Sequence, residues 1–217
     1  MKSILLAVLA SLGSVGYLIP TQAQVVVFNS FGPGNTYGSG IVWAVSGASV
    51  SGGYRGQAEF FTPATSGYLS SVLLATYHIS GSGLSNFYIA QDNGNGIPGN
   101  ILESFTDVLN ASSGFVTLNS TVKPLLQAGT EYWLCDEPAA DYSYNAWYQN
   151  NQGYAPGSAF ERSEWSWSAI PGAENSGVFR VSVTPVPEPS VTGLVILCGC
   201  WFLLRLKQPA VQDGSFS

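Results

Sequence analysis

The chain has 217 residues, of which 46% are hydrophobic and only 9% are charged, with a formal net charge of −6 at pH 7. A typical soluble domain carries about 25% charged residues, so this composition argues against a cytosolic enzyme. Only 7 Lys and Arg are present, and they do not cluster in the central part of the chain. Nucleic acid is therefore not an expected partner, because its phosphate charges would stay unneutralised.

The N-terminal segment is typical of a secretory signal peptide. Lys2 precedes an uncharged run from Ile4 to Ile19, and Thr21 and Ala23 supply small residues where a signal peptidase requires them. An N-terminal membrane anchor is the alternative, but glycines interrupt the apolar run. We therefore expect residues 1–23 to be removed and the rest of the chain to be exported.

Residues 24–185 are expected to form one β domain. At Phe179, Val181 and Val183 apolar residues alternate with polar ones, the pattern of a strand with one face in a core and the other in water. Gly, Pro, Asn and Ser separate further short apolar runs, and no stretch shows a helical period. The prediction is an all-β fold, an antiparallel β-sandwich or jelly-roll-like single domain. Further strands are expected at Val25–Phe28, Ile41–Val45, Gln57–Thr62, Ile101–Phe105, Phe115–Leu118, Glu131–Cys135 and Asn145–Gln149.

Two expected strands are close neighbours in the sequence. The strands Tyr68–Ile79 and Leu84–Gln91 are separated by the turn residues 81–83, which predicts a hairpin. Alternation would place a set of apolar residues on one face of the first strand. That set is Leu69, Leu73, Tyr77 and Ile79.

The segment from Asp92 to Gly96 has two interpretations. Carboxylate and amide oxygens at short spacing suggest a Ca²⁺ loop, in which Glu103 would be the last ligand. However, Gly94 stands where a ligand belongs, so the ligand count fails. Asn–Gly pairs followed by Pro–Gly favour tight turns instead. We favour the turns, and we expect no metal and no cofactor.

Residues suited to nucleophilic catalysis are scarce. His78 is the single histidine and is expected to face solvent at the end of a strand, and no Gly-x-Ser-x-Gly elbow occurs. Cys135 is predicted to be a buried thiol that fills apolar space. Glu161 and Glu164 lie close together among aromatic residues, so a glycosidase pair is an alternative, although exposed acids near a loop are far more common. The chain is not expected to be an enzyme.

The segment from Tyr142 to Trp167 is rich in aromatic residues interleaved with Asn and Gln. Such a combination suits a sugar, because the CH face of a pyranose stacks on a ring while its hydroxyls bond to amides. The candidate glycan contacts are Trp147, Tyr148, Trp165 and Trp167. The alternative, to which we give more weight, is that these rings belong to the core.

The C-terminal segment predicts a short hydrophobic helix. Residues 191–204 carry no charge and are followed directly by Arg205 and Lys207, which is typical of a helix with basic residues on the cytoplasmic side. Fourteen residues at about 1.5 Å each span roughly 21 Å, less than the ~30 Å hydrocarbon core of a bilayer. Such a helix is a marginal permanent anchor.

The motif VPEPS precedes this helix, and its two prolines keep the chain extended beside the membrane. The order of motif, helix and basic residues resembles the PEP-CTERM sorting signal of Gram-negative bacteria, which an exosortase of the inner membrane recognises and cleaves. Pro187, Glu188 and Pro189 match the family's motif residue by residue. The tail of residues 208–217 is longer than the family's usual end. The resemblance implies that residues 186–207 are a sorting signal.

The body also resembles a family, the extracellular choice-of-anchor β domains, with the R type as the nearest subtype. The resemblance rests on Tyr88–Gly99 (YIAQDNGNGIPG), on Ile101 and Leu102, and on Pro124–Leu134 (PLLQAGTEYWL). It covers most of residues 25–184. It implies a surface or extracellular role and supplies no reaction.

These observations predict an exported, noncatalytic protein of the cell surface or extracellular matrix. The chain would be anchored in the inner membrane before processing and would then reach the cell envelope or the outside. Its expected partners are an exosortase-type processing enzyme, the inner membrane and the exopolysaccharide layer. A carbohydrate-binding module of that layer is the alternative function, and a glycosidase is the second alternative.

Overall fold

The computed structural model describes residues 23–110, 112, 114–153, 160–163, 166–169 and 175–186. These residues form thirteen β-strands and one short 3-10 turn, η2 (Pro33–Asn35), and no α-helix occurs among them. All strand pairings are antiparallel. The expectation of an all-β antiparallel fold is confirmed.

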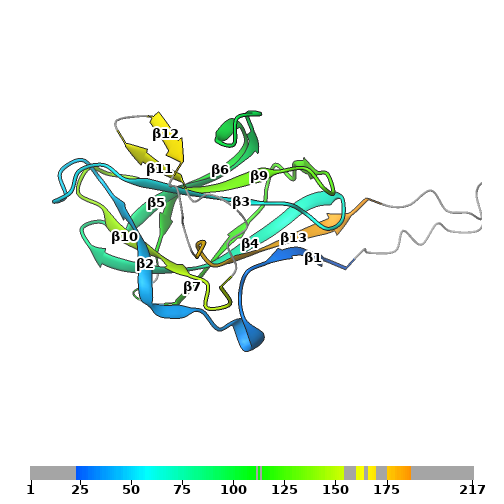
Figure 1. The fold of residues 1–217 in the computed structure, drawn as a ribbon, viewed down its shortest axis with the longest axis horizontal. Helices are drawn as coiled ribbons and strands as arrows, with labels where there is room; N and C mark the ends of the chain where they lie inside the picture. The colour runs from blue at the N-terminus through cyan, green and yellow to red at the C-terminus, as the bar shows by residue number, and fades with distance from the viewer. Residues whose placement is uncertain are drawn as a thin grey trace, which may run out of the picture.

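The strands form two sheets, which lie as two layers in Figure 1. Sheet A has seven strands in the order β1-β13-β4-β10-β2, with β7 and β8 also paired to β4. Its strands are β1 (Val25–Asn29), β2 (Gly38–Ser46), β4 (Gly67–Ser80), β7 (Gly114–Asn119), β8 (Leu125–Leu126), β10 (Tyr144–Gln149) and β13 (Phe179–Pro185). Sheet B has six strands in the order β12-β11-β3-β9-β5-β6. They are β3 (Gly56–Phe61), β5 (Leu84–Asp92), β6 (Pro98–Leu109), β9 (Tyr132–Pro138), β11 (Phe160–Ser163) and β12 (Ser166–Ala169).

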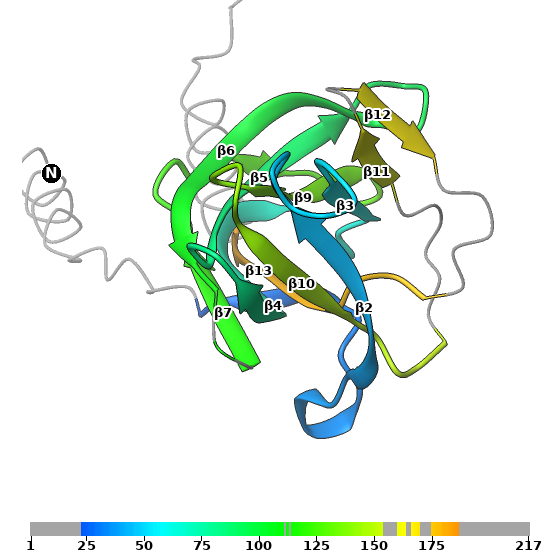
Figure 2. The same ribbon diagram turned by 90° about the vertical axis from the view of Figure 1, so that its left-hand side faces the viewer.

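Strand β4 is the longest strand of sheet A and pairs along both of its edges. The same residue, Leu73, lies opposite Arg180 of β13 and opposite Thr117 of β7, so these two strands flank β4. Further along the chain, Thr76 lies opposite Trp147 of β10. Figure 2 shows β7, β4, β10 and β2 in this lateral order.

The expectation that β4 and β5 form a hairpin is wrong. The two strands are consecutive, but β4 pairs only within sheet A, and β5 pairs with β6 and β9 in sheet B. The turn between them crosses from one sheet to the other. Gly81 and Gly83 both have positive φ there, and Gly81 packs so closely on Tyr142 that a Cβ would overlap its carbonyl oxygen.

The expectation that Leu69, Leu73, Tyr77 and Ile79 share one face of β4 is also wrong. Ser182 lies opposite Ser71 while Val183 lies opposite Leu69, so Ser70 is an extra residue on β4. Such a bulge reverses the alternation beyond it. Leu69 therefore points into the core, whereas Leu73 and Tyr77 lie on the outer face.

The main apolar core lies between the two sheets. Phe179, Val181 and Val183 of β13 point into it while their neighbours are half-exposed, which confirms the alternation expected for this strand. Sheet B contributes Phe61 and Leu134 to the same cluster. The cluster also includes Trp147, Leu69, Val72, Leu74, Phe87, Ile89 and Leu126.

The first and last strands of the body are neighbours. Val25 of β1 lies opposite Val183 of β13, and Asn29 lies opposite Arg180. The chain therefore enters and leaves the domain at the same end, to the right in Figure 1. Within the described residues, no helix is long and apolar enough to span a membrane. The expected signal peptide, the helix at 191–204 and the tail lie outside those residues.

We predict that Trp147→Ala lowers the free energy of unfolding by about 3–5 kcal/mol. The side chain is fully buried, its Nε1 donates to the carbonyl oxygen of Val178 at 3.0 Å, and its ring fills the space beside Gly177. Urea denaturation followed by far-UV circular dichroism measures the loss. The matched control is Tyr142→Ala, which changes a side chain that is 62% exposed. Equal stability of the two variants would contradict the placement of Trp147.

Candidate functional site

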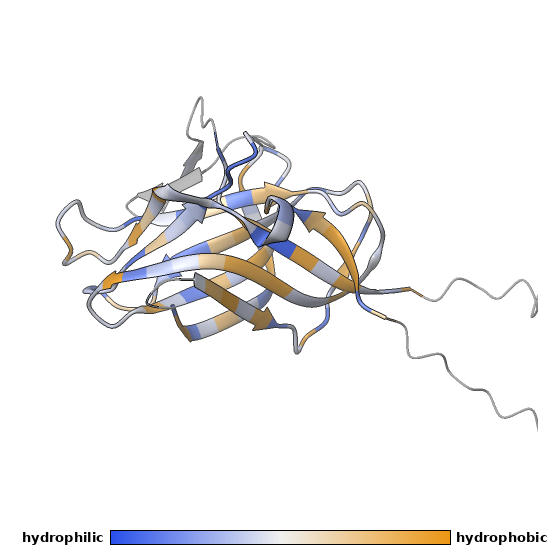
Figure 3. Ribbon diagram, turned by 90° about the horizontal axis from the view of Figure 1, so that it is seen from below, coloured by the Kyte–Doolittle hydropathy of each residue, from blue (hydrophilic) through white to orange (hydrophobic). Residues whose placement is uncertain are grey.

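Five aromatic rings gather on the outer face of sheet A, and we call them the aromatic patch. Tyr77 and Tyr148 lie 6.3 Å apart between ring centroids, and Tyr37 lies 4.9 Å from Tyr148. Phe115 lies 5.7 Å from both Tyr37 and Phe31. Phe115 is 47% exposed and Tyr77 is 37% exposed, so part of the patch is open to solvent. Figure 3 views this side of the molecule, where apolar and polar residues alternate along the strands.

The connection between β1 and β2 supplies two of these rings. The 3-10 turn η2 lies between Phe31 and Tyr37, and Gly34 and Asn35 adopt positive φ within it. The guanidinium of Arg180 donates to the Asn35 side-chain oxygen at 3.1 Å, which ties the connection to β13. The rings are therefore held by the connection and by the sheet together.

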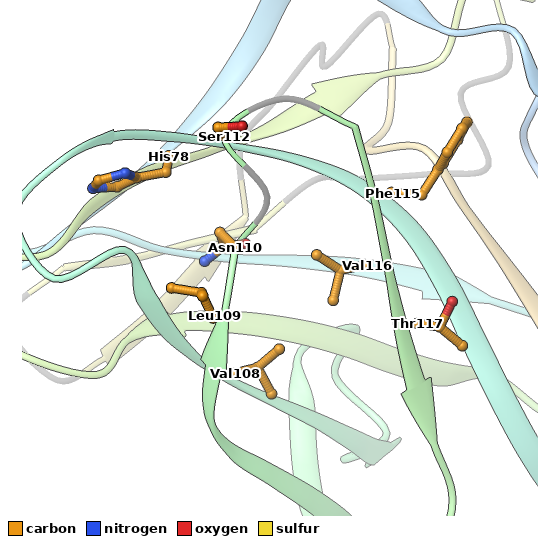
Figure 4. A pocket seen from close by; sticks show the side chains of 8 residues that line it. All are labelled: His78, Val108, Leu109, Asn110, Ser112, Phe115, Val116 and Thr117. Atoms are coloured by element: carbon orange, nitrogen blue, oxygen red, sulfur yellow. The ribbon is translucent and has the colours of Figure 1, made fainter.

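An open cleft of about 630 Å³ adjoins the patch. It lies where the chain passes from β6 in sheet B to β7 in sheet A, and Phe115 lines both the cleft and the patch. Figure 4 shows His78 and Asn110 at one end of the cleft and Phe115 at the other. Its lining combines apolar side chains with hydroxyl, amide and imidazole groups, so it is amphipathic. The remaining lining residues are Val108, Leu109, Ser112, Val116 and Thr117.

The structure separates the four residues predicted to contact a glycan. Trp147 is fully buried between the sheets, which corrects the expectation of a sugar contact there. Tyr148 points to the opposite face, where it is largely covered within the aromatic patch. Trp167 is half-buried against a small cluster on sheet B that includes Trp133, and its glycan role stays a prediction. Trp165 lies outside the described residues.

The segment from Asp92 to Gly96 forms turns, as the sequence favoured. The Asp92 carboxylate accepts the Gly94 N–H at 2.7 Å, and the Asn93 side-chain oxygen accepts the Asn95 N–H at 2.8 Å. Gly94 and Gly96 have positive φ. The second oxygen of Asp92 accepts the Trp133 indole N–H at 3.0 Å, so this carboxylate is already used to hold the β5–β6 connection.

Glu103 does not face this loop. Its carboxylate accepts hydrogen bonds from the Ser120 hydroxyl and from the N–H groups of Thr121 and Val122. Burial opposes its charge, but these hydrogen bonds outweigh that effect and lower its pKa. Among the described residues, no group of three or more His, Cys, Asp or Glu side chains is placed to hold a metal ion.

The remaining candidates for chemistry are placed as follows. Cys135 is fully buried beside Trp133, which confirms the expected buried thiol. The expectation that His78 faces solvent is wrong, because it lies on the inner face opposite Asn145 and its ring packs against Gly83. Glu161 lies on β11, but its side chain and Glu164 are outside the described part of the structure, so the glycosidase alternative stays a prediction.

The sequence did not reveal that Phe31, Tyr37 and Phe115 meet. Phe31 and Tyr37 come from the β1–β2 connection, whereas Phe115 comes from β7, far along the chain. Of the three residues, only Phe115 carried a signal in the sequence, because it lies in the strand expected at Phe115–Leu118. The contact with Tyr77 depends on the bulge at Ser70, which turns that side chain outward.

No protein-family model matches the sequence, and no curated protein matches it significantly. The two family resemblances therefore stay predictions.

A buried carboxylate on β3 makes the stability of the fold pH-dependent. Glu59 is buried, and its side chain accepts the Gly177 N–H at 2.8 Å. Burial raises the pKa of Glu59 to about 8 from 4.5, more than that hydrogen bond lowers it. Because the folded pKa is the higher one, this group stabilises the fold fully below its unfolded pKa, and the stability is lost as the pH rises through the folded value.

We predict that Glu59→Gln flattens the fall in stability between about pH 5 and about pH 8, by at most about 1.4 kcal/mol per pH unit. Glutamine keeps an acceptor for Gly177 but has no proton to lose. Chemical denaturation across this range measures the slope, with the exposed Glu131→Gln as the matched control. A variant whose slope equals that of the wild type would show that Glu59 does not titrate in the folded core.

Proposed function

We propose that the protein is an exported, noncatalytic protein of the cell surface or extracellular matrix, delivered by a C-terminal PEP-type sorting signal. The pairing of Val25 with Val183 supports this proposal most directly, because it brings both ends of the body to one side. A body whose two termini lie at the same end can be attached to a membrane through either terminus. Its opposite end and its outer faces then point away from the bilayer.

The steps follow from the order of the segments. The signal peptide carries the chain across the inner membrane, and the hydrophobic segment at 191–204 holds it there. An exosortase-type enzyme then cleaves near Pro187, Glu188 and Pro189, and the body enters the envelope or the exopolysaccharide layer. Between Gln24 and Pro189 the chain has 4 basic and 12 acidic residues. That charge favours solubility and disfavours binding to anionic polymers.

We predict that the exported species ends near Pro189 and that Glu188→Ala abolishes this processing. The carboxylate between two prolines is the charged feature that the enzyme would read, and Pro209→Ala in the tail is the matched control. Intact-mass measurement of the exported protein provides the readout. A species that retains Trp201 in the wild type indicates a simple membrane anchor and overturns the sorting proposal.

The aromatic patch favours a second function, the binding of a neutral glycan. Tyr77 and Phe115 present partly exposed rings on one face of sheet A, and exposed rings can stack on the CH face of a sugar. The patch therefore replaces Trp147 as the surface to test. An uncharged polysaccharide is the ligand class that the acidic body would tolerate.

We predict that Tyr77→Ala and Phe115→Ala each weaken glycan binding by roughly threefold to tenfold without unfolding the protein. A glycan array identifies the ligand, and titration calorimetry gives the affinities. Tyr142→Ala removes an exposed tyrosine outside the patch and serves as the matched control. An array on which the wild type binds no neutral glycan rules out this second function.

A further inference from the structure

At the end of the sandwich opposite the termini, the space between the sheets is lined by polar side chains. Sheet A contributes residues from β4 and β10, and sheet B contributes residues from β3, β5 and β9, joined by one residue that follows β6. We call this group the polar core, and all its members except His78 are buried. Its residues are Gln57, Thr76, His78, Ser85, Asn110, Asp136 and Asn145.

Strand pairings and hydrogen bonds place several of these residues side by side. Gln57 lies directly opposite Asp136 on neighbouring strands, and His78 lies opposite Asn145. The Ser85 hydroxyl accepts the Asn145 side-chain N–H at 3.1 Å across the two sheets. The same oxygen accepts the Asn110 side-chain N–H at 2.8 Å. Ser85 thus joins Asn110 and Asn145, and its weak hydrogen bond to Asp136 links the Gln57–Asp136 pair to them.

The amide donors of the polar core are all used within the protein. Gln57 donates to the carbonyl oxygen of Ala44 at 3.0 Å, and Asn145 donates to Leu84 as well as to Ser85. Asn110 donates to Gly83 and to Ser85. These bonds fix the orientation of each amide, with its nitrogen facing the backbone or Ser85. The amide oxygen of each residue then points away from those groups.

Several other buried acceptor atoms of the polar core, in contrast, lack a well-formed hydrogen bond. Burying an acceptor without a partner costs free energy, so each such group needs an explanation, such as a bound ion or water. Neither carboxylate oxygen of Asp136 has a well-formed hydrogen bond, although the Ser85 hydroxyl lies close enough to lower its pKa in part. The other unpartnered atoms are Gln57 Oε1, Thr76 Oγ1, His78 Nε2, Asn110 Oδ1 and Asn145 Oδ1.

This set of atoms has the chemistry of a hard-cation site. One carboxylate, three amide oxygens and a hydroxyl are the ligand types that Ca²⁺ takes, in a flexible shell of six to eight oxygens. Water could bond to single acceptors, but it would not offset the charge of Asp136. Burial raises the pKa of this carboxyl well above its usual range, the hydrogen bond from Ser85 opposes the rise only in part, and the charge of Glu137 adds to it.

Two residues of the polar core, His78 and Asn110, also line the cleft at the β6–β7 crossing. Both carry unpartnered atoms of the group. Figure 4 shows both side chains among those that line the cleft. The polar core therefore adjoins the cleft at these two residues.

We propose that the polar core binds one Ca²⁺ ion, with Asp136 as its charged ligand and the side-chain oxygens of Gln57, Thr76, Asn110 and Asn145 as neutral ligands. The ion joins sheet A to sheet B through the residues of the polar core. Mg²⁺ is a poor substitute, because it demands octahedral geometry and retains its water.

The test uses the full-length chain in detergent after treatment with EDTA. Titration calorimetry with CaCl2 is expected to give one site, and the melting temperature followed by tryptophan fluorescence is expected to rise with Ca²⁺ but little with Mg²⁺. Asp136→Asn is expected to weaken Ca²⁺ binding by at least roughly tenfold. The matched control is Asp107→Asn, an exposed acid on β6, which should bind like the wild type.

Thr76→Val separates ion binding from a purely structural role. Without Ca²⁺ this variant should melt at or above the wild-type temperature, because a buried hydroxyl without a partner has been removed. With Ca²⁺ its gain should be smaller than that of the wild type. The proposal is overturned if Ca²⁺ produces no heat and no thermal shift in the wild type. It is also overturned if Asp136→Asn or Thr76→Val responds to Ca²⁺ as the wild type does.

Discussion

Sheet A depends on the requirement that the backbone groups of a buried strand be hydrogen-bonded on both edges. Strand β4 meets this requirement with four partners, β7 and β8 on one edge and β10 and β13 on the other. The segments that close the sheet therefore come from both halves of the chain. The bulge at Ser70 then sets which side chains face the core and which form the outer surface.

The placement of the outer strands connects the fold with the proposed cellular role. Because β1 is the edge strand beside β13, the two ends of the body leave together, and the opposite end is free. The cleft and the polar core lie toward that free end, and the aromatic patch lies on the outer face of sheet A. Surfaces that could meet ligands are thus kept away from the side that would hold a membrane.

The interior is divided into two chemically different parts. Around Trp147, Phe61 and Phe179 the sheets are held by apolar contact and stacked rings. Around Ser85 and Asn145 they are held by side-chain hydrogen bonds that cross from one sheet to the other. An apolar contact adapts to many geometries, whereas a buried amide needs a partner in a defined direction. The polar part therefore restricts the relative position of the two sheets more than the apolar part does.

The sequence by itself determined that the body is built of strands, that Phe179, Val181 and Val183 face a core, and that the Asp92–Gly96 segment turns. These are local properties, since alternation and positive φ depend on neighbouring residues. Only the tertiary structure decided that β4 and β5 belong to different sheets, that Trp147 is internal and that Phe115 meets Tyr37. Backbone pairing and burial are settled between segments far apart in the chain, and the residues of the polar core come together only after six such segments have packed.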